Sequence, residues 1–178
     1  MTRIRFDGCD LSRAARDTPA ARVYGSGGAS VPEATVIVVR VAGPPYSGHC
    51  LCGGVRFEVA EEPLSAGYCH CTRCQRRTGT AASAQARLAP GSFRLLAGEA
   101  LVREYAPGDG WPKCFCSVCG SALWSKYPDT GEVGSVRLGL FDPGHGIRPQ
   151  WHTFVDYACA WEPIPDDGLE RYPEGKPR

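Results

Sequence analysis

The chain has 178 residues and a formal net charge of +1, from 20 Lys and Arg against 19 Asp and Glu. This length suits one compact domain with extensions. The small net charge argues against nucleic-acid binders that depend on a strong basic field, so no nucleic-acid partner is expected.

The first 45 residues are predicted to be a largely disordered N-terminal extension. Residues 1–33 are rich in Gly, Ala, Arg and Ser and offer little apolar surface to offset the entropy of ordering. Thr35–Val41 has strong β propensity and fits an edge strand and an apolar linker equally well. No apolar run here has the length of a signal peptide or a membrane span, which favours a cytoplasmic protein with reduced thiols and no membrane partner.

From Tyr46 to Pro165 the sequence predicts an all-β domain of short strands. Val55–Val59 alternates apolar and charged residues, as expected for a strand with one buried face. The best helix candidate is one or two turns around Thr72–Thr78. Further short β-like runs lie at Ser92–Leu96, Leu101–Tyr105, Ala122–Ser125, Val136–Phe141 and Thr153–Tyr157.

Ten cysteines are the most informative feature of the sequence, and most of them fall into three groups. Clustered thiols that stay reduced in one chain usually bind metal. The pair Cys50 and Cys52 can present two sulfurs on one face of an extended segment. A C-x-x-C turn folds both thiolates inward, and the residue after it often needs a positive φ, which Gly120 supplies. The groups are Cys50 with Cys52, Cys69 with Cys71 and Cys74, and Cys116 with Cys119.

These groups predict two zinc ions per chain. Zinc takes four tetrahedral ligands, so the two pairs Cys50, Cys52, Cys116 and Cys119 can form one closed structural site. The triple Cys69, Cys71 and Cys74 supplies only three ligands, and a zinc ion with a vacant fourth position is typical of a catalytic metal site.

The remaining cysteines and the four histidines could also offer ligand atoms to a metal. Cys114 could close the open site or replace a ligand. In an extended segment, however, it would lie beside a site that is already filled, so we expect its thiol to be a protonated neighbour of that site or a reactive spare. Cys9 and Cys159 are expected to be inert thiols. His70 lies between two ligands and is expected to point away from them, and His49, His145 and His152 are expected to be ordinary β-domain histidines.

Arginines surround the cysteine triple at Arg73, Arg76 and Arg77. Their guanidinium groups can stabilise the thiolates of a three-cysteine site and attract an anionic ligand through paired hydrogen bonds to carboxylates. A solvated surface run explains each of these arginines equally well.

The ordered cysteine motifs resemble the glutathione-dependent formaldehyde-activating (GFA/CENP-V) family. The resemblance covers residues 46–168 and leaves residues 169–178 as a polar tail. It implies a tent-like fold of small antiparallel sheets, a structural zinc and a catalytic zinc at the two sets of cysteines named above. Cys114 departs from the family pattern, where a polar or basic residue is expected. The segments that carry the resemblance are Ser47–Phe57, Tyr68–Gly79, Phe115–Gly120 and Pro149–Asp156, with Trp161 and Ile164–Asp167.

The resemblance implies a zinc-dependent carbon–sulfur lyase that joins glutathione and formaldehyde into S-hydroxymethylglutathione, or catalyses a related thiol-adduct reaction. The expected partners are therefore a small glutathione-like thiol and an aldehyde. Arg76 or Arg77 is the candidate for holding a glutathione carboxylate, and His70 is a candidate base. Two alternatives stay open: a non-enzymatic zinc-binding interaction module, which a closed second site would favour, and an enzyme for another thiol or electrophile.

Overall fold

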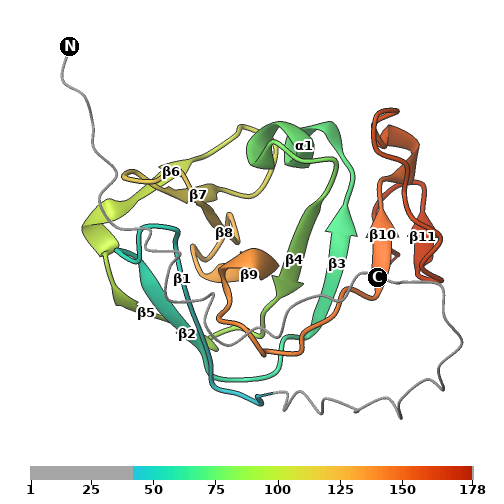
Figure 1. Ribbon diagram of the computed structural model, residues 1–178. Coiled ribbons are helices and arrows are strands. Elements are labelled where there is room, and N and C mark those ends of the chain that lie inside the picture. Colours follow the sequence, from blue (N-terminus) through green and yellow to red (C-terminus); the bar gives the residue numbers. More distant parts are fainter. Residues whose placement is uncertain (1–41, 178) are drawn as a thin grey trace, which may run out of the picture. The chain divides into compact units, whose positions relative to one another are not determined.

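The computed structural model describes residues 42–177 (Figure 1). Three predictions therefore lie outside the described residues: the disorder of residues 1–33, the strand or linker at Thr35–Val41, and the inert thiol at Cys9. Among residues 42–177, no helix has the length and hydrophobicity that a bilayer span requires.

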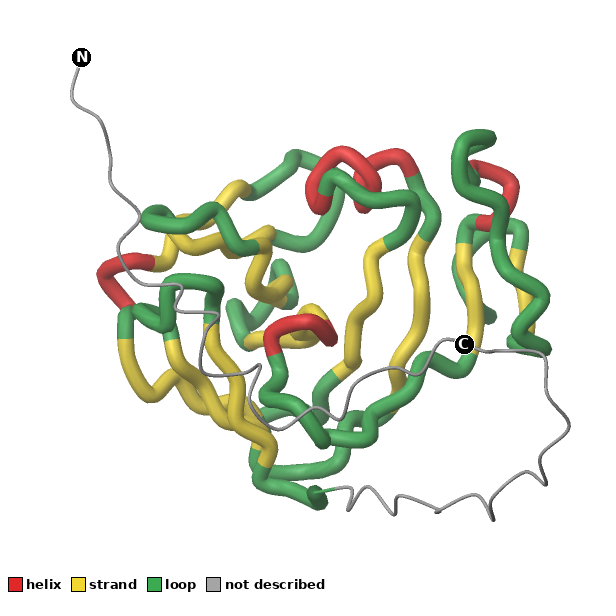
Figure 2. Tube along the Cα trace, viewed as in Figure 1, coloured by secondary structure: helices red, strands yellow, loops and turns green. Residues whose placement is uncertain are grey.

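The described chain is mostly β structure, as predicted, with one short α-helix (Figure 2). The helix, α1, covers Thr72–Thr78, the segment that the sequence indicated. Three 3-10 turns, η1 to η3, cover Glu99–Leu101, Leu138–Leu140 and Val155–Tyr157. The strands are β1 Tyr46–His49, β2 Arg56–Val59, β3 Ser65–Cys69, β4 Ser83–Arg87, β5 Phe93–Ala97, β6 Val102–Tyr105, β7 Lys113–Cys116, β8 Ala122–Lys126, β9 Val133–Arg137, β10 Trp151–Thr153 and β11 Glu170–Tyr172.

The strands form two sheets, of which only the smaller matches the expectation of small antiparallel sheets. The three-stranded sheet has the order β1-β2-β5 and is antiparallel. The larger sheet has eight strands in the order β11-β10-β3-β4-β9-β8-β7-β6. It is mixed, because β10 runs parallel to both β3 and β11. Long connections between these strands make parallel pairing possible, since parallel neighbours cannot be joined by a hairpin.

Two predicted strands near the C-terminus are wrong in part. The run Val136–Phe141 was expected to be one strand, but β9 ends at Arg137 and η2 follows. The run Thr153–Tyr157 was also expected to be a strand, yet only its first residue belongs to β10 and η3 follows Phe154, whose φ is 57°. A strand cannot continue through a residue in the left-handed region. In the segment expected to be a polar tail, β11 pairs with β10.

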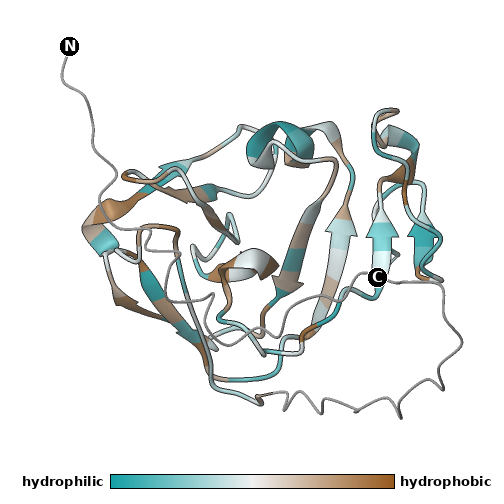
Figure 3. Ribbon diagram, in the orientation of Figure 1, coloured by the Kyte–Doolittle hydropathy of each residue, from teal (hydrophilic) through white to brown (hydrophobic). Residues whose placement is uncertain are grey.

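The hydrophobic core lies between the three-stranded sheet and one face of the larger sheet. Phe57 of β2 is fully buried, stacks on Phe93 of β5 at 5.6 Å between ring centroids, and meets the edge of Trp124 of β8 at 6.2 Å. Figure 3 shows alternating apolar and hydrophilic colour on β2, whereas β10 and β11 are pale or hydrophilic. β10 and β11 contribute no residue to this core.

Gly48 of β1 tests this packing. A Cβ at this position would lie 2.4 Å from Cζ of Phe57 and 2.5 Å from the backbone oxygen of Leu140. We expect Gly48→Ala to lower the free energy of unfolding by about 2 kcal/mol, because an overpacked core must shift its backbone. Urea unfolding measures this, with the exposed Gly108→Ala as control, since nothing lies within 4 Å of that position. Equal stability of the two variants would contradict the packing described here.

Candidate active site

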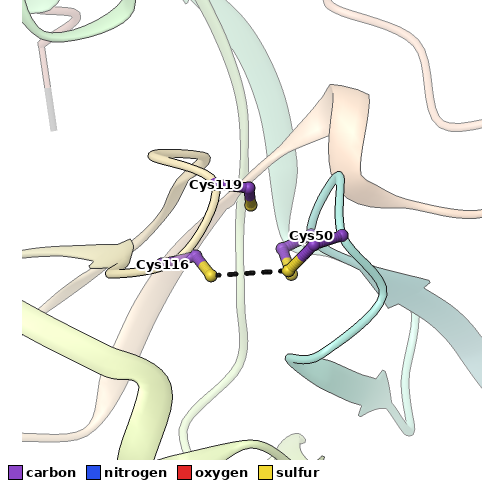
Figure 4. A group of neighbouring side chains, drawn as sticks. Cys50, Cys116 and Cys119 are labelled. Atoms are coloured by element: carbon purple, nitrogen blue, oxygen red, sulfur yellow. Dashed lines mark hydrogen bonds between the residues drawn. The ribbon is translucent and has the colours of Figure 1, made fainter. Parts of the chain in front are cut away.

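Four cysteines from two separate segments converge beside the core (Figure 4). Cys50 and Cys52 lie in the turn between β1 and β2, and Cys116 and Cys119 lie at the end of β7 and in the turn that follows. Their four sulfur atoms all lie within 4.8 Å of one another. The prediction that the two cysteine pairs form one group is therefore confirmed.

The two turns have the local geometry that inward-pointing thiolates need. Gly120, which the sequence predicted to have a positive φ, has φ 74°, and its N–H donates to the Cys116 carbonyl at 2.9 Å. In the first turn, Gly53 has φ 70° and donates to the Cys50 carbonyl at 2.8 Å. The N–H of Val55 donates to Sγ of Cys50 at 3.3 Å, which fixes the direction of this sulfur within the turn.

The sulfur spacing of this group fits a tetrahedral zinc ion. Four sulfurs at ~2.3 Å from one metal lie about 3.8 Å apart. Sγ of Cys52 lies 3.4 Å from Sγ of Cys50 and 3.8 Å from Sγ of Cys116. Burial raises the pKa of Cys119, but hydrogen bonds from the side chain and backbone of Ser121 outweigh it and lower the pKa to about 6. The donor set therefore suits a thiolate-bound divalent ion.

A second group contains the predicted triple, Cys69, Cys71 and Cys74, again within 4.8 Å. Cys69 ends β3, Cys71 is the N-cap of α1, and Cys74 lies in its first turn. The Cys71 sulfur accepts from the backbone N–H of Cys74 at 3.5 Å. The pKa of Cys71 is lowered to about 2, because the thiols of Cys69 and Cys74 donate hydrogen bonds to its thiolate. Neither cluster contains a disulfide.

The two predicted substrate arginines have different surroundings. Arg77 donates from Nη2 to the carbonyls of Cys114 and Trp124, both at 3.0 Å, and so ties α1 to β7 and β8. Arg76 is exposed and has no hydrogen-bond partner among the described residues. Arg73 donates to Asp109 at 2.5 Å. Arg76 is therefore the one of the three whose guanidinium group is available for an additional anion.

The three-cysteine group opens onto a cavity of about 1720 Å³, whereas none of the four-cysteine group lines it. One face of the eight-stranded sheet forms part of the cavity wall. Neighbouring residues of a strand point to opposite faces of the sheet. On four strands, every second residue lines the cavity and the residue between them is buried on the other face. The alternating lining residues are Gln85 and Arg87 on β4, Lys113 and Phe115 on β7, Ser135 and Arg137 on β9, and Trp151 and Thr153 on β10.

The cavity is strongly cationic, although the whole chain is nearly neutral. Its lining contains one carboxylate, Asp109, which pairs with Arg73. Two of the cations lie over aromatic rings: Lys176 over Trp151 at 3.7 Å and Arg87 over Trp111 at 5.4 Å. The cationic lining residues are Arg73, Arg76, Arg77, Arg87, Lys113, Arg137 and Lys176.

Comparisons with known proteins identify the family of the chain. The model of the glutathione-dependent formaldehyde-activating enzyme (GFA) family matches residues 45–157, well over half of the chain. The chain belongs to the GFA family. A crystal structure of a Rhodobacter sphaeroides protein, a Northeast Structural Genomics target, is 25% identical, with 71% of this chain and 98% of that chain covered and a TM-score of 0.45. No curated protein matches the chain.

Three cavity residues of this GFA domain were missed by the sequence analysis: Lys113, Arg137 and Arg87. Each lies on a strand whose bounds were uncertain or unrecognised, and no local motif connects them. Alternation along β4, β7 and β9 was the signal that places them on one face. Lys113 and Arg137 line the same cavity as the cysteine triple. Burial lowers the pKa of each, and the negative charge of the three cysteines opposes that shift.

Two buried histidines of the GFA domain, His70 and His152, form a hydrogen-bonded chain that ends at the exposed Asp167. Nε2 of His70 lies 2.8 Å from Nδ1 of His152, and Nε2 of His152 lies 3.1 Å from Oδ2 of Asp167. Because the Asp167 carboxylate accepts from His152, Nδ1 of His152 is left to accept from His70. Burial, the largest effect, lowers the pKa of His70, and the neighbouring ring of His152 lowers it further. Neither histidine lines the cavity, so this arrangement favours a positioning role for His70 over that of a base.

Cys114 belongs to neither cysteine group. It shares the buried face of β7 with Cys116, and its thiol points to the Glu104 carboxylate at 3.8 Å. Burial, the largest effect, raises the pKa of Cys114 to about 11, so the thiol stays protonated. Cys114 is therefore a protonated thiol outside both cysteine groups, as expected.

Because Cys114 lies outside both groups, Cys114→Ser should leave the metal content of the protein unchanged. A buried hydroxyl in place of the thiol should cost about 1–2 kcal/mol of stability. Elemental analysis and thermal melting test both statements, with the half-buried Cys159→Ser as control. Loss of one zinc ion from Cys114→Ser would make Cys114 a ligand and contradict this assignment.

Proposed function

We propose that the protein is a zinc-dependent carbon–sulfur lyase that converts glutathione and formaldehyde to S-hydroxymethylglutathione or catalyses a closely related thiol-adduct reaction. The observation that supports this most is the contrast between the two cysteine groups. One offers four sulfurs and does not line the cavity, whereas the other offers three and opens onto it. No fourth His, Cys, Asp or Glu joins the triple among residues 42–177, which favours an enzyme over an interaction module.

Both donor sets fit zinc, which prefers thiolate ligands in tetrahedral sites. Cys50, Cys52, Cys116 and Cys119 would hold a structural ion, and Cys69, Cys71 and Cys74 would hold a catalytic one. A zinc ion with three protein ligands offers a fourth position to a substrate thiol or carbonyl and lowers the pKa of the group that occupies it.

The residues of the cavity then bind and orient two substrates. In the forward reaction the thiolate sulfur forms a bond to the formaldehyde carbon, the C=O π electrons move to oxygen, and the proton released by the thiol ends on that oxygen. The cationic lining stabilises the thiolate before the bond forms and the oxyanion after it forms. Arg76, exposed at the end of α1, is suited to one glutathione carboxylate, as a planar guanidinium matches carboxylate geometry. In reverse, the same groups release thiol and aldehyde.

This proposal is tested by the rate at which glutathione and S-hydroxymethylglutathione exchange at equilibrium. Magnetisation transfer with ¹³C-formaldehyde measures that rate, and the spontaneous reaction is the baseline. The reduced, zinc-containing protein should raise the exchange rate in proportion to its concentration. Protein from which zinc has been removed by a chelator is the control. Exchange no faster than the spontaneous reaction, in a protein that holds both zinc ions, would contradict the proposed substrate pair.

A further inference from the structure

The sheet wall of the cavity contains a buried arginine that has no carboxylate partner among the described residues. Arg137 of β9 is 6% exposed and lines the cavity. Its guanidinium donates to Oγ of Ser83 at 3.0 Å, to Oγ of Ser125 at 3.1 Å and to Oε1 of Gln85. All three acceptors are neutral, and Nε finds no hydrogen-bond partner among residues 42–177. A charge this deeply buried is costly unless an opposite charge accompanies it.

A second cation shares one of these acceptors. Lys113 lies opposite Ser125 in the pairing of β7 with β8, and its Nζ donates to Oγ of Ser125 at 3.3 Å. Arg77 reaches the same oxygen at 3.5 Å. Three cationic side chains therefore converge on one hydroxyl, which has only two acceptor lone pairs. The hydrogen-bonding capacity of Lys113 and Arg137 exceeds what the surrounding protein accepts.

The nearby cysteine triple compensates this charge only in part. Three thiolates and one divalent ion together carry a single negative charge, whereas Lys113 and Arg137 bring two positive charges. Asp109, the one carboxylate that the described residues contribute to the cavity wall, is already paired with Arg73. An anion supplied by a ligand would balance the remaining charge.

We propose that Lys113 and Arg137, joined through Ser125, form a carboxylate-binding subsite beside the cysteine triple. That the bound carboxylate belongs to the substrate thiol rests on the proposed function, whereas the subsite itself does not. The guanidinium carries its charge permanently, so its partner is a group that is already ionised before reaction, which favours a carboxylate over the oxygen of the aldehyde. Arg76 lies at the exposed end of α1, so the two sites serve different anions.

The test compares two thiols that differ only in charge, 3-mercaptopropionate and 3-mercaptopropionamide. Isothermal titration calorimetry measures their binding to the zinc-containing protein with no aldehyde present, so the result does not depend on the lyase reaction. We expect the carboxylate to bind ~10-fold more tightly than the amide to the wild type. Lys113→Met should remove most of that preference by weakening only the carboxylate, and Arg137→Lys should reduce it in the same direction.

The matched control is Lys126→Met, which removes the same charge from a lysine that pairs with Glu104 at 2.9 Å and does not line the cavity. It should keep the preference for the carboxylate. Equal affinity of the wild type for both thiols would overturn the subsite, as would an unchanged preference in Lys113→Met. If catalysis is observed, a fall in rate that is equal for both thiols in Lys113→Met would assign the pair to the reacting oxygen and also overturn the proposal. Absence of catalysis with the binding preference intact would reject only the lyase activity.

Discussion

Replacing Cys116 with serine should abolish folding of the domain at ordinary temperatures. Cys116 is fully buried and joins β7 to the turn before β2 through the four-cysteine group. Binding of a structural zinc ion contributes about 10–16 kcal/mol in small domains, as much as the whole stability of a typical protein. Circular dichroism should show loss of the cooperative transition, and elemental analysis should show zinc well below two ions per chain.

Cys159→Ser is the control for this variant, because Cys159 belongs to neither group. It should melt close to the wild type and keep both zinc ions. A Cys116→Ser protein that melts within a few degrees of the wild type and holds two zinc ions would show that the four-cysteine group does not fasten the fold.

Replacing Cys71 with serine should have the opposite pattern, with the fold retained and activity lost. Cys71 is the N-cap of α1, and serine is among the best N-cap residues, so the helix should keep its start. The same change removes one of three thiolates from the cavity group and should release one zinc ion. We expect the catalysed rate to fall by ~100-fold or more, because the site then lacks its metal.

The exchange assay and elemental analysis measure both effects on one sample. Cys74→Ser should behave in the same way, because its sulfur belongs to the same group. Loss of thermal stability in Cys71→Ser as large as in Cys116→Ser would argue against a division into structural and catalytic sites. Full activity with one zinc ion remaining would place the reaction elsewhere.

The cysteine groups could be predicted from the sequence because each motif is local. The spacing of Cys69, Cys71 and Cys74 brings three sulfurs together within one strand end and one helix turn, whatever the rest of the fold does. Gly120 is equally local, since its positive φ belongs to the turn itself. The helix at Thr72–Thr78 was found for the same reason.

The cavity wall could not be predicted, because it depends on long-range strand pairing. Lys113 and Arg137 meet at Ser125 only through the order β7-β8-β9 in the larger sheet. The β4 segment Ser83–Arg87 was not recognised, since it contains small and polar residues with low β propensity. The net charge of +1 gave no indication that seven cationic side chains line one cavity, because the net charge does not depend on where the charged residues lie.

The hydrogen-bonded chain of His70, His152 and Asp167 is a third feature that sequence alone did not reveal. His152 was expected to be an ordinary histidine, and in sequence it lies 82 residues from His70. The two meet because β10 runs parallel to β3, a pairing for which the sequence offers no signal. The chain holds the segment between Cys69 and Cys71 from the face opposite the cavity.

We expect one metal site to be closed by four protein sulfurs and the other to be open to a thiol. Cadmium-113 NMR of the cadmium-substituted protein tests this most directly, because it observes each metal separately and its shift depends on the number of sulfur ligands. We predict two resonances, one typical of four sulfurs and one of three, with only the second moving when glutathione is added. Two four-sulfur resonances that both stay unchanged with glutathione would contradict this division into a closed and an open metal site.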